Sequence, residues 1–433
     1  MDARRRVLDA DVLVADGKIA AVKTDDRRRS LKGTAATVRV LDCTGLVVIP
    51  GLVQAHIHLC QTLFRGLADD LTLEQWLARR IWPLEAAHTP DTVYWSAMLG
   101  GAELLLGGTT AILDMETVRH TGAACEAIET LGLRATVGKC LMDAPGAFAG
   151  LREDTDRALA EASDLCAHWH GRGDGRLRWC WAPRFAPSCT GPLLRAVSDL
   201  AARTGTLIHT HAAETPLELE MVKRATGHDE ITYLDSVGVS GPMVALAHCV
   251  WVDSEGIARL ARQRTGVVHC PSSNLKLGSG IAKVPEMLAA GCRVALGADG
   301  APCNNRLDGF TEMRLAALIQ KPRLGPDALP AAQVLELATL GGARVLGLDD
   351  EIGSIEVGKR ADLAVLDLSG PHAQPEEADL VSRIVYSARA SDVRHVLVDG
   401  KVTVKEGRLR TADYGEIRRE ANRCARRLAR AVR

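Results

Sequence analysis

Residues 48–66 hold the densest group of side chains able to do chemistry. The stretch reads Val-Ile-Pro-Gly-Leu-Val-Gln-Ala-His-Ile-His-Leu-Cys-Gln-Thr-Leu-Phe-Arg-Gly, with His56 and His58 at its centre. Alternate residues of a strand point to the same face, so a His-x-His at a strand end directs two imidazoles at one point. Neutral imidazole binds zinc, iron or copper. Because such pairs also occur by accident on surfaces, the metal interpretation depends on further ligands downstream.

Such residues do appear downstream, each after an apolar run. His209-Thr-His211 is followed by Glu214, Ala-His248 ends another run, and Asp299 stands between alanine and glycine. Singly, each has a plain alternative: a core histidine, a helix cap or a solvated helix start. Together, imidazoles and carboxylates gathered at the ends of predicted strands indicate a metal site.

The elements that must position these residues follow from the hydrophobic pattern. Short apolar runs predict strands over 48–53, 109–113, 134–139, 177–181, 206–211, 243–250, 266–269 and 293–298. Helical patterns lie between them, over 92–106, 122–131, 154–168, 193–202, 217–224 and 254–263. Eight strands alternating with helices predict an α/β fold with a parallel (β/α)8 TIM-like barrel, whose catalytic groups sit at the C-terminal strand ends. A doubly wound sheet is the alternative, but no Gly-x-Gly-x-x-Gly follows the first strand.

Both ends of the chain predict a small β-sandwich domain. Residues 11–14 and 19–22 flank Asp16-Gly17, a hairpin signal, while 27–32 reads as a charged loop and 38–43 as a strand. Residues 361–366 and 395–398 read as strands, with Asp399-Gly400 as a hairpin turn. We therefore expect a small β domain built from 1–49 and 349–410, a barrel over 50–348 and a basic helix over 411–433.

Composition bears on partners and compartment. The 433 residues carry a net charge of −1, which gives no electrostatic footprint for nucleic acid, and no apolar run reaches the roughly 18 residues of a membrane span. The twelve cysteines form no Cys-x-x-Cys and the charged start lacks a signal-peptide pattern, so we expect reduced thiols in the cytoplasm. We also expect a homo-oligomer, with the arginine-rich last helix as either a solvated face or a subunit contact.

The order of the motifs resembles the amidohydrolase superfamily. It runs Pro-Gly-(x)4-His-x-His, His-x-x-Glu, Ala-His and Gly-x-Asp-Gly. Residues 269–278, 299–305 and 353–362 look specific to its cytosine-deaminase-like branch with one metal, which holds methylthioadenosine/S-adenosylhomocysteine deaminases, guanine deaminases and triazine hydrolases. The match covers nearly the whole chain. No lysine stands at a fourth strand end in a bridging context, so a two-metal site is not implied.

Carried over residue by residue, the resemblance implies one divalent metal ion held by His56, His58, His211 and Asp299. Zinc is the expected ion and iron the alternative, because imidazole suits both. Three neutral imidazoles and one carboxylate leave a position for water, whose pKa the metal lowers toward about 7. In the implied mechanism, Asp299 takes a proton from that water and Glu214 protonates the ring nitrogen and then the leaving amine. His248 stabilises the developing charge.

The implied reaction is hydrolytic deamination of an aminopurine, an adenosine-type nucleoside or guanine. The implied substrate-binding residues are Gln61, Trp82, Glu85, Arg184, Phe185 and Asn304. In the methylthioadenosine group, the residue matching Glu85 holds ribose hydroxyls. The segment around Arg184 and Phe185 instead resembles guanine deaminases, where the arginine would donate two hydrogen bonds to a carbonyl edge and the phenylalanine would stack on the ring. The alternatives are a structural salt bridge for Arg184 and core packing for Phe185.

Other functions stay open from the sequence. The same site could displace chloride or an alkylamine from a triazine ring, although Glu214 favours deamination because it supplies the proton that an amine leaving group needs. A catalytically inactive relative would be expected to have lost ligands, and none is lost. The arginines that meet a homocysteine carboxylate are not clearly retained, with Lys139 and Arg152 nearest. Relatives usually have a strand before a Met-Asp similar to Met1-Asp2, so we expect a smaller N-terminal β unit.

Overall fold

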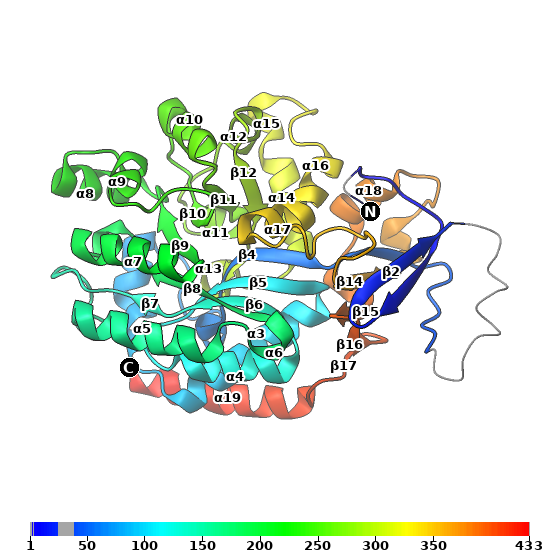
Figure 1. The fold of residues 1–433 in the computed structure, drawn as a ribbon, viewed down its shortest axis with the longest axis horizontal. Helices are drawn as coiled ribbons and strands as arrows, with labels where there is room; N and C mark the ends of the chain where they lie inside the picture. Colours follow the sequence, from blue (N-terminus) through cyan, green and yellow to red (C-terminus); the bar gives the residue numbers. More distant parts are fainter. Residues whose placement is uncertain (1, 3, 25–38, 433) are drawn as a thin grey trace.

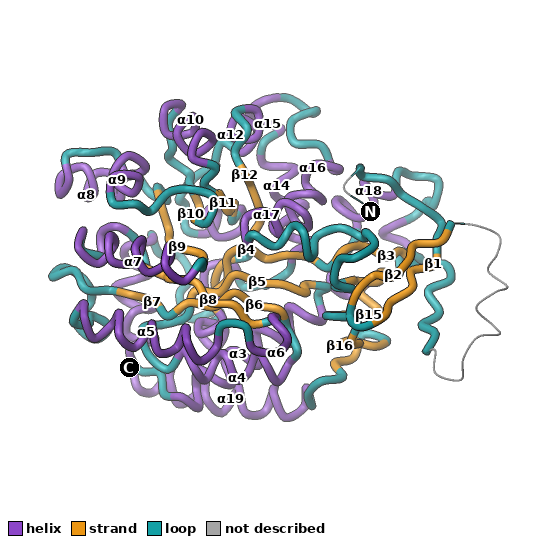
Figure 2. Tube along the Cα trace, in the orientation of Figure 1, coloured by secondary structure: helices purple, strands orange, loops and turns teal. Residues whose placement is uncertain are grey.

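A barrel of parallel strands wrapped in helices makes up most of the described chain (Figure 1). The computed structural model describes residues 2, 4–24 and 39–432. A smaller β unit lies at one end of the barrel, and the strands form the inner layer with the helices outside it (Figure 2). The predicted (β/α)8 barrel with a small β domain is confirmed.

Eight strand positions build the barrel. They are β4 (Leu52–His58), β5 (Thr109–Met115), β6 (Arg134–Gly138), β8 (Leu177–Pro183), β9 (Leu207–Ala212), β10 (Val244–His248), β11 (Gly266–His269) and β12 (Arg293–Leu296) with its continuation β13 (Asp299–Gly300). β12 pairs with β11, and β13 pairs with β4 with Asp299 opposite Ile57. The eighth barrel position is therefore made of two segments: β12 bonds to β11, and β13 bonds to β4 and closes the ring. A short β7 (Cys140–Leu141) adds to β8.

The first predicted strand, 48–53, is wrong as a single element. The structure divides it into β3 (Val47–Pro50), which belongs to the small β domain, and β4 of the barrel. The division falls at Gly51, where a Cβ atom would lie 2.1 Å from Thr110 Oγ1. The close backbone approach that glycine permits here lets one apolar run serve two sheets.

Helices cover the barrel, and all six predicted ones are present. The longer ones are α3 (Pro90–Leu106), α4 (Thr121–Leu131), α5 (Thr155–Trp169), α7 (Gly191–Thr204), α8 (Pro216–Thr226), α9 (Glu230–Ser236), α10 (Ser254–Gln263) and α14 (Gly309–Ile319). Shorter ones include η2 (Leu59–Phe64), α1 (Leu73–Trp76), η3 (Leu77–Ile81), α2 (Trp82–Ala86), α6 (Arg172–Gly175), α11 (Pro271–Lys276), α12 (Val284–Ala289), α13 (Ala301–Asn304), α15 (Lys321–Leu324), α16 (Ala331–Glu336), η5 (Leu337–Gly341), α17 (Gly342–Leu346) and η7 (Arg383–Ser387). Local signals fix their ends: α7 starts where Thr190 accepts from the Leu193 N–H and stops at Gly205, whose φ is 63°.

The small β domain joins distant parts of the chain. Its five-stranded antiparallel sheet runs β17 (Arg408–Leu409), β16 (Lys401–Lys405), β15 (Val393–Val398), β14 (Leu363–Leu366) and β3. A hairpin of β1 (Asp11–Ala15) and β2 (Lys18–Lys23) turns at Asp16-Gly17 as predicted. Ile19 of this hairpin is buried with Ala361 and Leu363, so the hairpin packs on the sheet.

Two sequence predictions for the N-terminal segment come out differently. The strand predicted at 38–43 is wrong for residues 39–43, which form no strand, and Val40 is 85% exposed. Val38 and the charged loop predicted at 27–32 lie outside the described residues.

The C-terminal helix α19 (Tyr414–Ala431) lies along the outside of the barrel (Figure 1). It buries one stripe, Ile417, Ala421, Cys424 and Leu428, at the spacing of an amphipathic helix. Arg423 and Arg427 reach Asp91 at the start of α3. Some of the predicted arginine face is therefore used within the chain.

Two bulk expectations can be compared with the described chain. All twelve cysteines are unpaired, and eleven of them are buried. Among residues 2, 4–24 and 39–432, no helix has the length and apolar character needed to cross a bilayer.

Candidate metal and catalytic site

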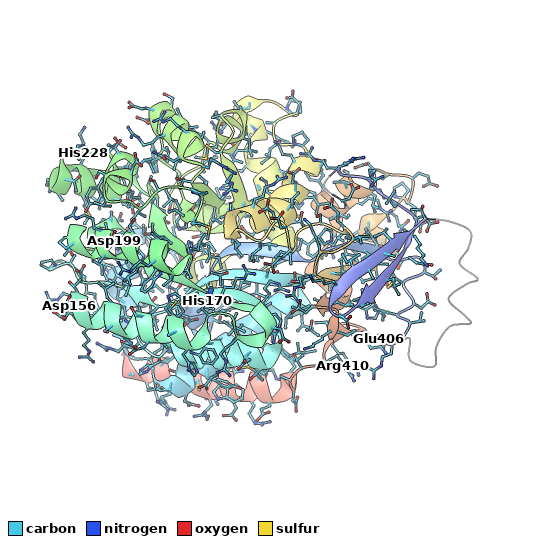
Figure 3. All side chains as sticks on the ribbon, viewed as in Figure 1. Asp156, His170, Asp199, His228, Glu406 and Arg410 are labelled. Carbon is cyan, nitrogen blue, oxygen red and sulfur yellow. The ribbon has the colours of Figure 1, made fainter. Side chains whose placement is uncertain are left out.

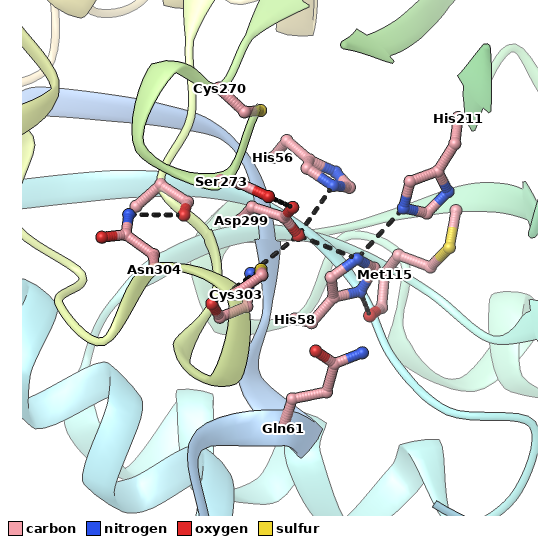
Figure 4. A network of polar contacts seen from close by, with 12 residues as sticks. His56, His58, Gln61, Met115, His211, Cys270, Ser273, Asp299, Cys303 and Asn304 are labelled. Atoms are coloured by element: carbon pink, nitrogen blue, oxygen red, sulfur yellow. Dashed lines mark hydrogen bonds and ion pairs between the residues drawn. The ribbon is translucent and has the colours of Figure 1, made fainter. Parts of the chain in front are cut away.

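Four side chains from three barrel strands converge at the C-terminal end of the barrel (Figure 4). We call His56, His58, His211 and Asp299 the His/Asp cluster. Asp299 Oδ1 lies 3.2 Å from His56 Nε2 and 3.3 Å from His58 Nε2. The Nε2 atoms of His58 and His211 are 3.2 Å apart. The structure therefore brings together the four residues predicted to hold the metal.

Some imidazoles of the chain lie far from the cluster. Figure 3 labels His170 and His228, and both are exposed on the outside of the molecule. Cluster side chains are buried except that of His211, which is half-buried. Burial and strand-end position, rather than residue type alone, separate the cluster from these surface histidines.

Two of the cluster imidazoles are oriented by backbone carbonyls. His58 Nδ1 lies 2.7 Å from the Met115 carbonyl oxygen, and His211 Nδ1 lies 2.6 Å from that of Arg184. A carbonyl only accepts, so each Nδ1 carries the proton and each Nε2 presents its lone pair to the cluster. This is the tautomer that a metal ligand requires.

The third imidazole is oriented by another histidine, His209. Its Nδ1 lies 3.1 Å from the Ala245 carbonyl oxygen, so its Nε2 is the acceptor for the His56 Nδ1–H at 2.7 Å. His56 Nε2 is buried and makes no hydrogen bond within the described chain. An orphaned lone pair beside a carboxylate fits a bound cation. The sequence indicated His209 only through the second His-x-His, and its supporting role was not predicted.

Charge at the cluster suits a cation. Burial lowers the pKa of His58 to about 4 and also lowers the pKa values of His56 and His211, so all three imidazoles are neutral near pH 7. Burial acts to raise the pKa of Asp299, but His56 and His58 outweigh it and hold that pKa well below its usual range. One negative charge among neutral nitrogens is a donor set that zinc accepts.

Asp299 is fixed by two donors, one on α11 and one on β13 itself. Ser273 Oγ donates to Oδ2 at 2.7 Å, and the Gly300 N–H donates to Oδ1 at 2.7 Å. The backbone of Asp299 itself is left-handed, with a φ of 62°. A non-glycine residue in this region is uncommon and is often found at functional sites.

The two residues predicted as an acid–base pair stand beside the cluster. His248 Nε2 lies 3.5 Å from Glu214 Oε2 and 3.8 Å from Asp299 Oδ2, and its Nδ1 lies 2.8 Å from Asn274 Oδ1. Burial raises the pKa of Glu214 to about 7. Burial acts to lower the pKa of His248, but Glu214 and Asp299 outweigh it and raise that pKa. The carboxyl group can thus gain or lose a proton near neutral pH.

A cavity opens over the cluster, with apolar side chains on one side. We call Leu73, Trp76, Leu77, Phe185 and Leu277 the apolar wall. Three of these come from the short helices α1 and η3, which follow β4 along the chain and are not strand ends themselves. Apart from Phe185, they were not predicted as site residues, because a Leu or Trp on a short helix looks like ordinary core in sequence.

Of the predicted substrate residues, Gln61, Arg184 and Phe185 line this cavity. Trp82, Glu85 and Asn304 do not line it. Trp82 stacks on Phe148 with ring centroids 6.0 Å apart, and the Asn304 amide donates to the Ala298 carbonyl and to Glu312.

Glu85 is buried behind the cavity, where it holds two of the lining residues. Arg184 donates to both of its oxygens, at 2.6 and 3.1 Å, and Gln61 Nε2 donates to Oε1 at 2.9 Å. Both terminal nitrogens of Arg184 therefore face Glu85, the salt-bridge alternative weighed from the sequence. Gln61 Oε1 is buried and has no hydrogen-bond partner among the described residues, and a Cβ at Gly300 would lie 2.2 Å from it.

The profile of the amidohydrolase family matches residues 47–403. The chain belongs to the amidohydrolase family. It is 41% identical to the 5-methylthioadenosine/S-adenosylhomocysteine deaminase of Desulforudis audaxviator over 98% of this chain and 95% of that one. It also resembles two solved structures, each covering 98% of this chain. A zinc-bound adenosine deaminase from Xanthomonas campestris is 34% identical with a TM-score of 0.90 and 94% of its chain covered. The zinc complex of an atrazine chlorohydrolase from Arthrobacter aurescens is 28% identical, with a TM-score of 0.90 and 97% covered.

Proposed function

We propose that this protein is a metal-dependent hydrolytic deaminase, which replaces a ring amino group of an aminopurine with oxygen and releases ammonia. The observation that carries the proposal is the placement of Glu214 and His248 beside the His/Asp cluster, at the head of a cavity with an apolar wall. The 41% identity to a methylthioadenosine/S-adenosylhomocysteine deaminase over nearly the full length supports it.

The proposed cofactor is one divalent ion, with zinc expected, held by the His/Asp cluster. The orphaned His56 Nε2, the neutral imidazoles and the charged Asp299 fit such an ion. When bound, zinc lowers the pKa of a coordinated water toward about 7 and so supplies hydroxide at neutral pH. The zinc in both similar structures supports this choice.

The proposed roles of the chain's own residues follow from their positions. Asp299 Oδ2 accepts the proton that the attacking water loses. Glu214, with its pKa of about 7, donates a proton to the ring nitrogen next to the reacting carbon and recovers one from the new hydroxyl group. The amine takes the proton held by Asp299 and leaves as ammonia. His248 Nε2, 3.5 Å from Glu214, stabilises the charge that develops on the new oxygen. The ring carbon gains a C–O bond and loses its C–N bond.

For the substrate we propose an adenosine-type nucleoside with an uncharged 5′ end, with 5′-methylthioadenosine tested first and guanine second. The two basic residues considered as partners for a charged amino-acid tail do not favour such a substrate. Lys139 is buried in an ion pair with Glu153, and Arg152 is exposed and donates to the Pro145 carbonyl. On the ring side, the orphaned Gln61 Oε1 would accept from a ring N–H or amino group, and Phe185 offers a stacking face.

An ammonia-release screen with the zinc-loaded protein tests the proposal. The panel is 5′-methylthioadenosine, adenosine, S-adenosylhomocysteine, guanine, 8-oxoguanine and two chlorotriazines, with chloride measured beside ammonia. We expect ammonia from at least one purine and the fastest turnover with methylthioadenosine. Chloride release from a triazine without ammonia from any purine would favour the chlorohydrolase alternative. No release from any compound by protein holding one zinc would contradict enzyme function of this class.

Three further proposals concern the whole chain. We propose a cytoplasmic location, supported by twelve unpaired cysteines. We propose a homo-oligomer, with the exposed arginines of α19 as one candidate subunit contact, which sedimentation would test. The division into 1–49 and 349–410, 50–348 and 411–433 is likewise proposed, and limited proteolysis would test it.

A further inference from the structure

The backbone directly before Glu214 has a conformation that is unusual for the residue found there. It lies in the connection between β9 and α8, directly after Ala213, whose φ is 53°. Alanine rarely adopts this left-handed conformation, so the surrounding contacts must hold it. The proposed proton transfers require the Glu214 carboxyl group in one orientation, which makes those contacts relevant to the reaction.

Two buried glutamates accept hydrogen bonds from the backbone N–H groups of Ala213 and Glu214 at this bend. Glu218 Oε2 accepts from the Glu214 N–H at 2.7 Å, and Glu230 Oε2 accepts from the Ala213 N–H at 2.8 Å. Glu218 is 4% exposed and Glu230 1%. Burial raises the pKa values of both carboxyl groups, and Glu218 raises that of Glu230 further. A proton on one of two neighbouring buried carboxyl groups lets them stand together without two charges.

A serine holds the side chain itself. Ser279 Oγ donates to Glu214 Oε1 at 3.0 Å, which leaves Oε2 as the oxygen 3.5 Å from His248 Nε2. Ser279 is 2% exposed, and its position is fixed because its N–H donates to the Asn274 carbonyl oxygen at 2.8 Å. Asn274 also bonds His248 through its side chain. The same turn therefore positions both members of the acid–base pair.

We propose that Ser279 and the Glu218–Glu230 pair are positioning residues that hold Glu214 with Oε1 occupied and Oε2 free to exchange its proton with the substrate. The inference rests on the proposed deaminase function. Ser279 acts on the carboxyl group directly, and the glutamate pair acts on the backbone that carries it. Within the described chain, none of the three makes a hydrogen bond or ion pair with the His/Asp cluster, so we expect their loss to leave the metal in place.

A double-mutant cycle tests Ser279. With the fastest substrate of the screen, Ser279→Ala should lower kcat about 10- to 100-fold with KM changed less than about threefold, because orientation is lost but the cavity is kept. In the Glu214→Gln background the same change should alter the residual kcat less than about twofold. Equal losses in both backgrounds, or no loss in the parent enzyme, would overturn the proposal. Ser354→Ala, a buried hydroxyl bonded to Lys359, is the matched control with activity kept.

The glutamate pair is tested by loss and rescue. Glu218→Ala should lower kcat about tenfold, while Glu218→Gln, which keeps an acceptor oxygen for the Glu214 N–H, should recover most of that loss. Equal kcat in the two variants would contradict the role. Metal content and thermal melting are measured on each variant, so that a folding defect is recognised. If Glu218→Ala fails to fold, the comparison of Glu218→Gln with the parent enzyme decides: a loss of tenfold or more in the glutamine variant would overturn the role.

Failure of the proposed deaminase function can be distinguished from failure of the positioning role. If the parent protein turns over no compound of the screen, the function fails, and crystal structures of the zinc-loaded parent and Ser279→Ala proteins then test the positioning alone. A Glu214 carboxyl group that turns away from His248 only in the variant supports the proposal. The same orientation in both overturns it.

Discussion

The His/Asp cluster and the cavity wall meet at one cavity, yet they are built in different ways. Each cluster imidazole has its Nδ1 bonded, to Met115, to Arg184 or to His209, and directs its Nε2 inward to the cluster. On the substrate side, Arg184 and Gln61 depend on Glu85, and the remaining surface is mostly apolar. Metal binding requires donor atoms that are held rigidly, whereas substrate binding requires a surface that fits the shape of the ligand. We expect mutations on the two sides to have separable effects.

The largest effect is expected from Asp299→Ala, which removes the only carboxylate of the cluster. Metal content should fall from about one ion per chain to near zero, and activity by about 10³-fold or more, since three neutral imidazoles hold the ion without charge compensation. Elemental analysis and ammonia release measure both. His228→Ala, an exposed imidazole outside the barrel, serves as control. A variant that keeps its ion would remove Asp299 from the ligand set.

Glu214→Gln should separate chemistry from metal binding. We expect about 10²- to 10⁴-fold loss of kcat with about one ion still bound, because the amide fills the same space but transfers no proton. Elemental analysis of the purified variant is read beside its rate of ammonia release. Full activity would mean that another group supplies the proton.

Arg184→Met tests the cavity side through stability. It leaves the Glu85 carboxylate buried with Gln61 as its main remaining donor, and we expect a loss of about 3–5 kcal/mol in the free energy of unfolding. The Arg184→Met/Glu85→Met double variant should recover much of this, since no unpaired charge remains. Denaturant unfolding measures all three proteins. A single variant as stable as the parent would show that the pair is not needed for folding.

The same variant also sharpens the substrate assignment. Because both terminal nitrogens of Arg184 face Glu85, we expect activity on adenosine-type and guanine-type substrates to fall by similar factors. A selective loss on guanine would show that Arg184 leaves Glu85 and binds the carbonyl edge of that substrate, as the sequence resemblance implied.

The smallest effect is expected from His209→Phe on the cluster side. His56 would lose the acceptor that orients its ring, and we expect roughly 10- to 100-fold weaker metal binding with the ligand set complete. Competition with a chelator measures it. His269→Phe is the matched control, a fully buried imidazole whose two nitrogens have no partner within the described chain. Equal weakening in both variants would contradict a specific role for His209.

Local pattern was enough for much of the fold. The eight strand positions and six barrel helices follow from apolar periodicity and from caps such as Thr190 and Gly205, which act within a few residues. The first barrel strand was misjudged because Gly51, which divides it, is required by contact with Thr110, fifty-nine residues away in sequence. The strand predicted at 38–43 is wrong for residues 39–43, because strand propensity alone does not form a strand without a partner to pair with.

From sequence alone came the residue types of the candidate site: the two His-x-His pairs, Glu214, His248 and Asp299, all placed by spacing after apolar runs. Tertiary structure decided how they are used. Closure of the ring through β13 brings Asp299 to His56, and the left-handed turn at Ala213 brings Glu214 toward His248. The pairing of Arg184 with Glu85 depends on contacts between distant segments. Spacing determines which face a side chain takes on its own element, but only the packed barrel determines what that face meets.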